Sequence, residues 1–229
     1  MSAREPLPPR GERTSDRRAR GEKILARLRL SYPDAHCALE YATPFQLLVA
    51  TILSAQCTDA RVNMVTPRLF AEYPTPAAIA TAAPDRVEEL IRSTGFFRQK
   101  ARNIVATGQR IMNDFAGTMP ETVNELKTMP GAARKTANVV VADCFPANID
   151  GIAVDTHVQR VARRLALTRS WEPEQVERDL MRDIPRTAWH EVTHLLIEHG
   201  RTTCTARKPR CSQCPIAQLC PSEGRFRAT

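Results

Sequence analysis

The chain has 229 residues, of which 42% are hydrophobic and 25% charged, and it carries a formal net charge of +8 with a pI near 9.5. This length suits one domain or two small lobes, and the charge favours a polyanionic partner, most often a nucleic acid, over a surface charged only for solubility. Only 9 glycines and a 5% aromatic fraction argue against an all-β fold, and no apolar run could span a membrane. We expect a soluble, cytoplasmic protein, since the N-terminus lacks the apolar core of a secretory signal.

The first segment, residues 1–20, is rich in proline and arginine and shows no apolar periodicity. We expect most of it to be a disordered basic tail, which either touches phosphates loosely or has no role. An amphipathic helix should follow from about residue 16 to residue 30, with Ile24, Leu25 and Leu28 on one face.

A series of short helices is expected next, and each has a recognisable start signal. Thr43, Pro44 and Gln46 form a capping box ahead of residues 47–53, which are apolar nearly all round and should form a central, buried helix. Further helices should begin near Asp59, Thr75, Asp85, Phe97 and Thr122. No segment shows the alternation of a strand, so the fold class should be all-α.

Residues 126–144 (LKTMPGAARKTANVVVADC) form a helix-hairpin-helix pattern. One helix should end at Met129, Pro130 and Gly131 should make a tight turn, and a second helix should start at Arg134. The backbone N–H groups at the start of that second helix can bind a phosphate oxygen, a contact that does not read the bases.

Two charged residues stand at expected helix starts. Lys135 lies in the first turn of the second hairpin helix, where the helix dipole and any burial favour its neutral amine. Such an amine could attack a sugar carbon and form a Schiff base, although a lysine that binds phosphate as a point charge is the alternative. Asp155 should be the N-cap of residues 156–165, and its carboxylate could also stabilise a cationic sugar transition state.

Two groups of residues near the C-terminus have the spacing of metal ligands. His190, Glu191 and His194 have the H-E-x-x-H spacing of zinc peptidases, but nothing else in the sequence supplies the open metal and cleft that such an enzyme needs. Four thiols follow, at Cys204, Cys211, Cys214 and Cys220. Their spacing alone fits either zinc or an iron–sulfur cluster, although zinc sites more often have two C-x2-C pairs.

The sequence resembles the endonuclease III family, the helix-hairpin-helix DNA glycosylases and AP lyases, over most of its length. The matching stretches are LLVATILSAQCTDARVN, STGFFRQKARNI, MPGAARKTANVV, AVDTHVQRV and HGRTTCTARKPRCSQCPIAQLC. The resemblance implies two helical lobes with a DNA cleft between them. One is a six-helix barrel domain with the hairpin, residues 37–149; the other joins residues 21–36 to residues 150–229, which end in a 4Fe–4S loop.

The resemblance also implies a reaction. Lys135 would displace an oxidised pyrimidine at C1′ with help from Asp155, and β-elimination through the Schiff base would cut the strand 3′ to the site. A monofunctional relative lacks the lysine, so Lys135 favours combined excision and nicking. The alternatives are a monofunctional glycosylase or bare AP lyase on this fold and a helix-hairpin-helix DNA-binding protein without catalysis.

The expected partner is double-stranded DNA with damaged pyrimidines or abasic sites, bound by a monomer, near the nucleoid if the protein is bacterial. Gln56 would fill the gap left by the flipped base. Phe96 would be a wedge in the opposing strand, where an aliphatic residue is usual, or else a core residue. His157 would contact a phosphate, or else only pack and cap. The further expected DNA contacts are Gly131, Ala133, Arg134, Arg207, Lys208 and Arg210, and the expected 4Fe–4S ligands are Cys204, Cys211, Cys214 and Cys220.

The hairpin departs from the family pattern at one position. The family usually has Gly-x-Gly, whereas this chain has Gly131, Ala132 and Ala133. Glycine adopts positive φ freely and alanine does not. Ala133 therefore either keeps a negative φ or weakens the grip of the hairpin on DNA.

Overall fold

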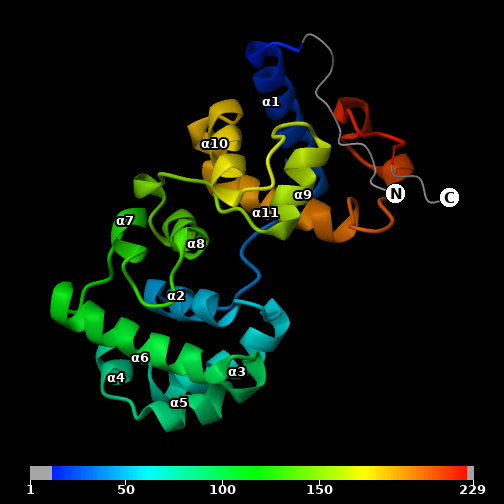
Figure 1. Cartoon of the computed structure of the whole chain (residues 1–229). Helices are drawn as coiled ribbons and strands as arrows, with labels where there is room; N and C mark the ends of the chain where they lie inside the picture. Colours follow the sequence, from blue (N-terminus) through cyan, green and yellow to red (C-terminus); the bar gives the residue numbers. More distant parts are fainter. Residues whose placement is uncertain (1–11, 226–229) are drawn as a thin grey trace. The chain divides into compact units, whose positions relative to one another are not determined.

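The computed structural model describes residues 12–225, and over that range the chain is helical with no strand (Figure 1). The prediction of an all-α fold is confirmed. The chain divides into two compact units, one of residues Cys37–Asp150 and one that joins the residues up to His36 to those from Gly151 onward. We call them the hairpin unit and the cysteine unit. Residues 1–11, which hold half of the expected basic tail, lie outside the described residues.

None of the described helices combines the length and the apolar character that a membrane span requires.

The hairpin unit consists of seven α-helices and two 3₁₀ helices. They are α2 (Pro44–Leu53), α3 (Asp59–Glu72), α4 (Pro76–Ala80), α5 (Pro84–Ile91), η1 (Arg92–Thr94), α6 (Phe97–Asp114), α7 (Val123–Leu126), α8 (Arg134–Cys144) and η2 (Pro146–Asn148). In Figure 1, α2 lies between α8 and α6 and contacts both.

Helix α2 is the centre of the hairpin unit, as its apolar sequence predicts. Every residue from Leu47 to Leu53 is buried. The Thr43 side chain accepts a hydrogen bond from the Gln46 backbone N–H at 3.3 Å, and Gln46 in turn accepts one from the Ala42 N–H at 2.8 Å. The start of this buried helix is therefore fixed by polar contacts at its exposed end.

Helix α6 makes its closest approach to a neighbour at Gly108. A Cβ placed on Gly108 would lie 2.4 Å from the Ile79 Cγ2 atom and 3.0 Å from the Pro76 carbonyl oxygen. These atoms belong to α4, so the absence of a side chain at position 108 lets the two helices touch.

The cysteine unit, as far as the structure describes it, contains four α-helices and three 3₁₀ helices. They are α1 (Thr14–Ser31), α9 (Thr156–Arg164), α10 (Pro173–Asp183), η3 (Arg186–Ala188), α11 (Trp189–Thr202), η4 (Cys211–Gln213) and η5 (Ala217–Leu219). Helices α9 and α11 pack together, and α1 lies against α10 and α11. Its core includes the predicted face of the first helix, Ile24, Leu25 and Leu28.

The prediction of a tail over residues 1–20 is wrong for its last part, because α1 already begins at Thr14. The arginines of this segment are bound to the rest of the unit. Arg17 pairs at 2.5 Å with Asp183, whose side chain has no exposed surface, and Arg20 donates to the Leu165 carbonyl at 2.6 Å. Composition suggested a solvated tail, but these partners come from distant parts of the sequence.

We predict that Gly108→Ala destabilises the protein by about 1–3 kcal/mol, because the added methyl group must push α4 away from α6. Helix propensity alone would give the opposite result, because alanine favours a helix over glycine by about 1 kcal/mol and would stabilise the protein at an open position. Urea unfolding followed by circular dichroism measures the change. Asn113→Ala, at an exposed position of the same helix, is the control and should stay within about 0.5 kcal/mol of the wild type. A more stable Gly108→Ala variant would contradict the packing described.

Candidate functional site

The hairpin forms as the sequence predicts, with α7 and α8 joined by a tight turn, although α7 ends at Leu126 instead of Met129. Gly131 has a φ of +82°, and a Cβ there would lie 2.7 Å from the Asn103 Nδ2 atom on α6. Thr107, also on α6, donates its hydroxyl to the Pro130 carbonyl at 3.0 Å. The turn is therefore seated on α6, which fixes where α8 begins.

Ala133 resolves the question raised by the missing second glycine. Its backbone is extended, with φ −81° and ψ 175°, a conformation that any residue adopts. Of the two alternatives, the hairpin keeps negative φ. Ala133 is the N-cap of α8 and makes no side-chain hydrogen bond to the first N–H groups of that helix. The N-terminus of α8 thus has the character of an anion site.

Lys135 is the second residue of α8 and is exposed. Its neighbour Arg134 is half-buried. An exposed amine in the first turn after the hairpin is open to a ligand held by that hairpin.

Gln56 and Phe96 share an unusual backbone conformation. Gln56 follows α2 with a φ of 52°, and Phe96 precedes α6 with a φ of 46°. Both side chains are exposed, and that of Phe96 is 69% exposed. The core-packing alternative for Phe96 is therefore wrong. A large apolar side chain that is exposed on a left-handed backbone is rare and strained, which favours a role in binding.

Sequence reasoning missed Lys100, which lies close to both of these segments. It is only 5% exposed, and its ammonium donates to the carbonyls of Leu53 and Thr94 at 2.8 Å each. Burial lowers the pKa of Lys100, an effect that the Cys57 thiolate would oppose. The signal in the sequence was its spacing, since Lys100 is four residues before the buried Ile104 and so lies on the apolar face of α6.

Asp155 is the N-cap of α9, as predicted, and its Oδ1 atom accepts from the Val158 N–H at 2.7 Å. His157 is half-buried, and its Nδ1 atom lies 3.2 Å from the Arg160 guanidinium. Burial lowers the pKa of His157, which the Asp155 charge opposes. Arg160 is fixed by the Gly200 carbonyl at 2.8 Å. This setting favours the packing alternative for His157 over a charged contact with phosphate.

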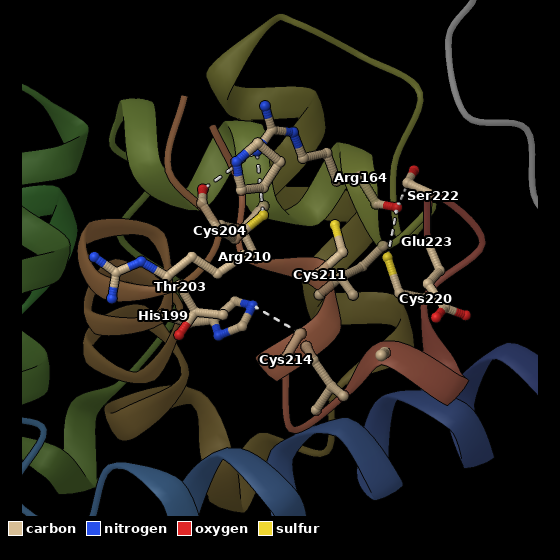
Figure 2. Close-up of a pocket in the computed structure, with 15 residues that line it drawn as sticks. Arg164, His199, Thr203, Cys204, Arg210, Cys211, Cys214, Cys220, Ser222 and Glu223 are labelled. Carbon is tan, nitrogen blue, oxygen red and sulfur yellow. Dashed lines mark hydrogen bonds between the residues drawn. The ribbon is translucent and has the colours of Figure 1, made fainter. Parts of the chain in front are cut away.

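The four predicted cysteines line one pocket of the cysteine unit, together with Arg164 and His199 (Figure 2). Burial raises the pKa of the Cys220 thiol to about 11 and that of Cys214 above its usual value. Such thiols lose their protons readily only when they bind a metal, which favours the thiolate form. Four sulfur donors around one pocket suit an iron–sulfur cluster. In the described range, no three His, Cys, Asp or Glu side chains form a group that could hold a metal ion.

Arg164 and His199 hold the wall of that pocket. The Arg164 guanidinium donates to the carbonyl of Thr205 at 2.7 Å and to that of Ala206 at 2.9 Å. His199 is 2% exposed, its Nδ1 atom lies 3.0 Å from the Tyr32 hydroxyl, and burial lowers its pKa to about 4. The buried guanidinium therefore fixes the backbone around the thiols, and the buried imidazole lies beside one of them, with its Nε2 atom 3.8 Å from the Cys214 sulfur.

The loop between the first two cysteines is held at several points along its backbone. The Thr205 hydroxyl donates to the Lys208 carbonyl at 2.8 Å, and the Arg210 N–H donates to the Thr203 carbonyl at 2.9 Å. The side chains of Arg207, Lys208 and Arg210 are exposed. They form a basic surface on an ordered loop, as a phosphate contact requires.

The H-E-x-x-H motif lies on α11, where Glu191 has a structural partner. Its two carboxylate oxygens each accept from the Arg29 Nε atom at 3.0 Å, which joins α11 to α1. His190 is exposed. The carboxylate that a peptidase would use as its base is thus engaged in an ion pair.

Comparison with known families identifies two matching segments. Residues 49–186 match the family described as HhH-GPD superfamily base excision DNA repair protein, and residues 204–220 match the iron-sulfur binding domain of endonuclease III. The second segment begins at the first and ends at the last of the four cysteines.

Curated relatives include endonuclease III from three bacteria. The chain is 51% identical to that of Synechocystis sp. (strain ATCC 27184 / PCC 6803 / Kazusa), over 91% of this chain and 94% of the relative. It is 44% identical to that of Bacillus subtilis (strain 168), over 82% and 86%, and 40% identical to that of Escherichia coli (strain K12), over 89% and 95%.

Solved structures agree with these relatives. A trapped covalent intermediate of an endonuclease III with DNA is 42% identical, with a TM-score of 0.84 over 90% of this chain and 96% of that one. A non-covalent endonuclease III–DNA complex matches equally well, with the same identity, TM-score and coverage. A thermostable thymine-DNA glycosylase, 17% identical with a TM-score of 0.80 over 90% and 97%, shares the fold.

We predict that one of two substitutions in the hairpin impairs the protein and that the other has little effect. Gly131→Ala should destabilise the protein by about 1–2 kcal/mol and weaken duplex DNA binding, because the alanine would be strained at positive φ and would collide with Asn103. Ala133→Gly should change DNA affinity by no more than about twofold, or about 0.4 kcal/mol, because position 133 needs no glycine. Fluorescence anisotropy with a labelled duplex measures both. A large gain in affinity for Ala133→Gly would show that the alanine does impair the hairpin.

Proposed function

Because the chain belongs to the endonuclease III family, we propose that it removes oxidised pyrimidines from double-stranded DNA and then nicks the strand, through a Schiff base on Lys135. It is a DNA glycosylase and AP lyase of base excision repair, DNA is its partner, and its cofactor is a 4Fe–4S cluster. We propose further that the protein acts as a monomer in the cytoplasm.

The position of Lys135 carries the proposal. The residue is exposed in the first turn of α8, next to backbone N–H groups that can hold a DNA phosphate. A phosphate held there would bring the neighbouring sugar to the amine. The trapped covalent DNA intermediate solved for a 42% identical endonuclease III supports a covalent route.

The proposed reaction needs no oxidant or reductant. The Lys135 amine attacks C1′, the glycosidic bond breaks, and the base leaves with the bonding electrons and takes a proton. Ring opening gives an imine that makes the C2′ proton acidic. Loss of that proton expels the 3′ phosphate by β-elimination, and water then releases the lysine from the cut sugar.

We assign Asp155 the stabilisation of positive charge on the sugar as the base departs. Its carboxylate already accepts the Val158 N–H, so the α9 N-terminus holds it in place.

Gln56 and Phe96 are the residues we assign to the duplex around the flipped nucleotide. The target base must leave the stack before its C1′ can be attacked. An exposed amide can fill the gap that it leaves, and an exposed phenyl ring can enter between bases of the opposing strand.

The cluster is assigned to Cys204, Cys211, Cys214 and Cys220. Bound there, it would join the C-terminal loop to the core of the cysteine unit and hold the loop of Arg207, Lys208 and Arg210 against DNA phosphates. This is a structural role. When bound, the cluster supplies the positive charge that keeps the buried thiols ionised.

We predict that Lys135→Gln still binds lesion DNA but loses nicking and borohydride-trapped adducts by at least about a thousandfold, because the amide cannot form an imine. Single-turnover cleavage of duplexes with an oxidised pyrimidine or an abasic site provides the measurement. The control is Lys127→Gln, an exposed lysine of the same hairpin, which should behave as wild type. Nicking that survives Lys135→Gln would refute the assignment. A wild-type protein that binds lesion DNA without any adduct would instead indicate a monofunctional or non-catalytic relative.

We predict that Asp155→Asn separates the two roles of that residue. Asparagine caps helices as well as aspartate does, so the stability should be retained, whereas the loss of charge should slow base excision by about a hundredfold. Thermal unfolding and single-turnover excision are measured on the same preparation. If excision is unchanged, Asp155 is only a helix cap.

A further inference from the structure

Lys100 has a buried ammonium group whose two acceptors lie on different segments. The Nζ atom donates at 2.8 Å to the carbonyl of Leu53, the last residue of α2, and at 2.8 Å to that of Thr94, the last residue of η1. The residue is 5% exposed. Hydrogen bonds from a charged donor in such a site are stronger than those between neutral groups.

Each of these carbonyls stands just before one of the two strained, exposed residues. Leu53 is three residues before Gln56, and Thr94 is two residues before Phe96. Other hydrogen bonds hold each segment only within itself: Ser54 donates its hydroxyl to the Thr51 carbonyl at 2.9 Å, and Thr94 donates its hydroxyl to the Ile91 carbonyl at 2.9 Å. The Cys57 N–H donates to the Ser54 carbonyl at 3.0 Å, which closes the first turn. Lys100 is itself fixed to the second segment, since its N–H donates to the Phe96 carbonyl at 3.1 Å.

A purely structural role explains only part of this arrangement. A cation at the C-terminus of α2 is favoured by the helix dipole, and one carbonyl would be enough for that. Burying an ammonium is unfavourable, and an apolar side chain at this position of α6 would avoid it. The second bond, to Thr94, is the one that connects the two segments through a single atom.

We propose that Lys100 is a positioning residue for nucleotide flipping, which holds Gln56 and Phe96 at a fixed separation so that both enter the duplex together. This inference rests on the proposed function, because it assumes that these two residues act on the duplex. Lys100 itself touches neither DNA nor the reacting sugar.

The proposal separates two substrates. In a duplex the enzyme must evict a nucleotide and fill the space, so loss of the Lys100 bonds should impair the reaction. In a single strand that already carries an abasic site nothing has to be evicted. The lysine chemistry on that strand should be unaffected.

The test compares Lys100→Met, which keeps the length and apolar stem but loses both hydrogen bonds, with Ile104→Val, a core substitution one turn further along α6. Lys100→Met should lower single-turnover excision from a lesion duplex by about tenfold or more, as misplacement of positioning groups does. Borohydride trapping on a single-stranded abasic oligonucleotide should stay at the wild-type level. Ile104→Val should leave both near wild type. Phe96→Ala provides the comparison, since it should show the same split between substrates.

Two readouts do not depend on catalysis. With 2-aminopurine beside the target nucleotide, binding of the wild type should raise the fluorescence as the stack opens, and Lys100→Met should lose most of that rise. In the free protein, amide exchange should become faster in residues 54–57 and 94–97 together. Should Lys100→Met not fold, Lys100→Gln, which keeps a donor, is measured in the same way.

The proposal is overturned if Lys100→Met excises from duplex as the wild type does, if it loses duplex and single-strand activity equally, or if exchange rises in only one of the two segments. It is also overturned if neither variant at position 100 folds, since the residue would then serve only the core. Failure of the proposed function looks different, because the wild type itself would give no adduct on either substrate.

Discussion

The contact between Gly131 and Asn103 sets the geometry on which the hairpin depends. Because position 131 has no side chain, the turn lies directly on α6, and its neighbouring carbonyl is bound by Thr107 of the same helix. The start of α8 is thereby placed with respect to the longest helix of the hairpin unit, and the position of Lys135 follows from it. In the function that we propose, phosphate binding and placement of the nucleophile would thus come from one backbone arrangement.

Several arginines of the cysteine unit stabilise its interior. Arg17 binds a buried carboxylate, and Arg160 and Arg164 bind backbone carbonyls of the α11 end and of the cysteine loop. A guanidinium suits this purpose because its several donors have a fixed geometry and it stays charged when buried. The net charge of the chain therefore overstates the charge available to DNA. The loop with Arg207 and Lys208, whose side chains are exposed, is the surface that we propose for DNA phosphates.

Local signals in the sequence predicted much of the fold. The apolar run of residues 47–53, the caps at Thr43 and Asp155, and the Pro130–Gly131 turn act within a few residues, so their sequence is enough to identify them. The family resemblance, confirmed by relatives of 40–51% identity, supplied the reaction and the cluster.

Features that depend on distant partners were not predicted. Arg17 and Arg20 were taken for part of a tail because Asp183, which binds Arg17, and the Leu165 carbonyl, which binds Arg20, are far away in the sequence. Lys100 was overlooked because a lysine on an apolar helix face is buried only where carbonyls from other segments converge on it. The negative φ of Ala133 could be seen only in the structure, because the residue type alone left both a negative φ and a strained positive φ open.

At position 96, the stability of the fold and the proposed role in repair favour different residues. A phenyl ring left in water on a left-handed backbone makes the free enzyme less stable than a glycine would, and under the proposed function that cost would be offset only when the ring is inserted in a duplex. Selection for stability alone would favour a glycine at this position, whereas the proposed role in repair would favour the ring. A search for stabilising substitutions would therefore select position 96 early, although the proposed function needs the ring of Phe96.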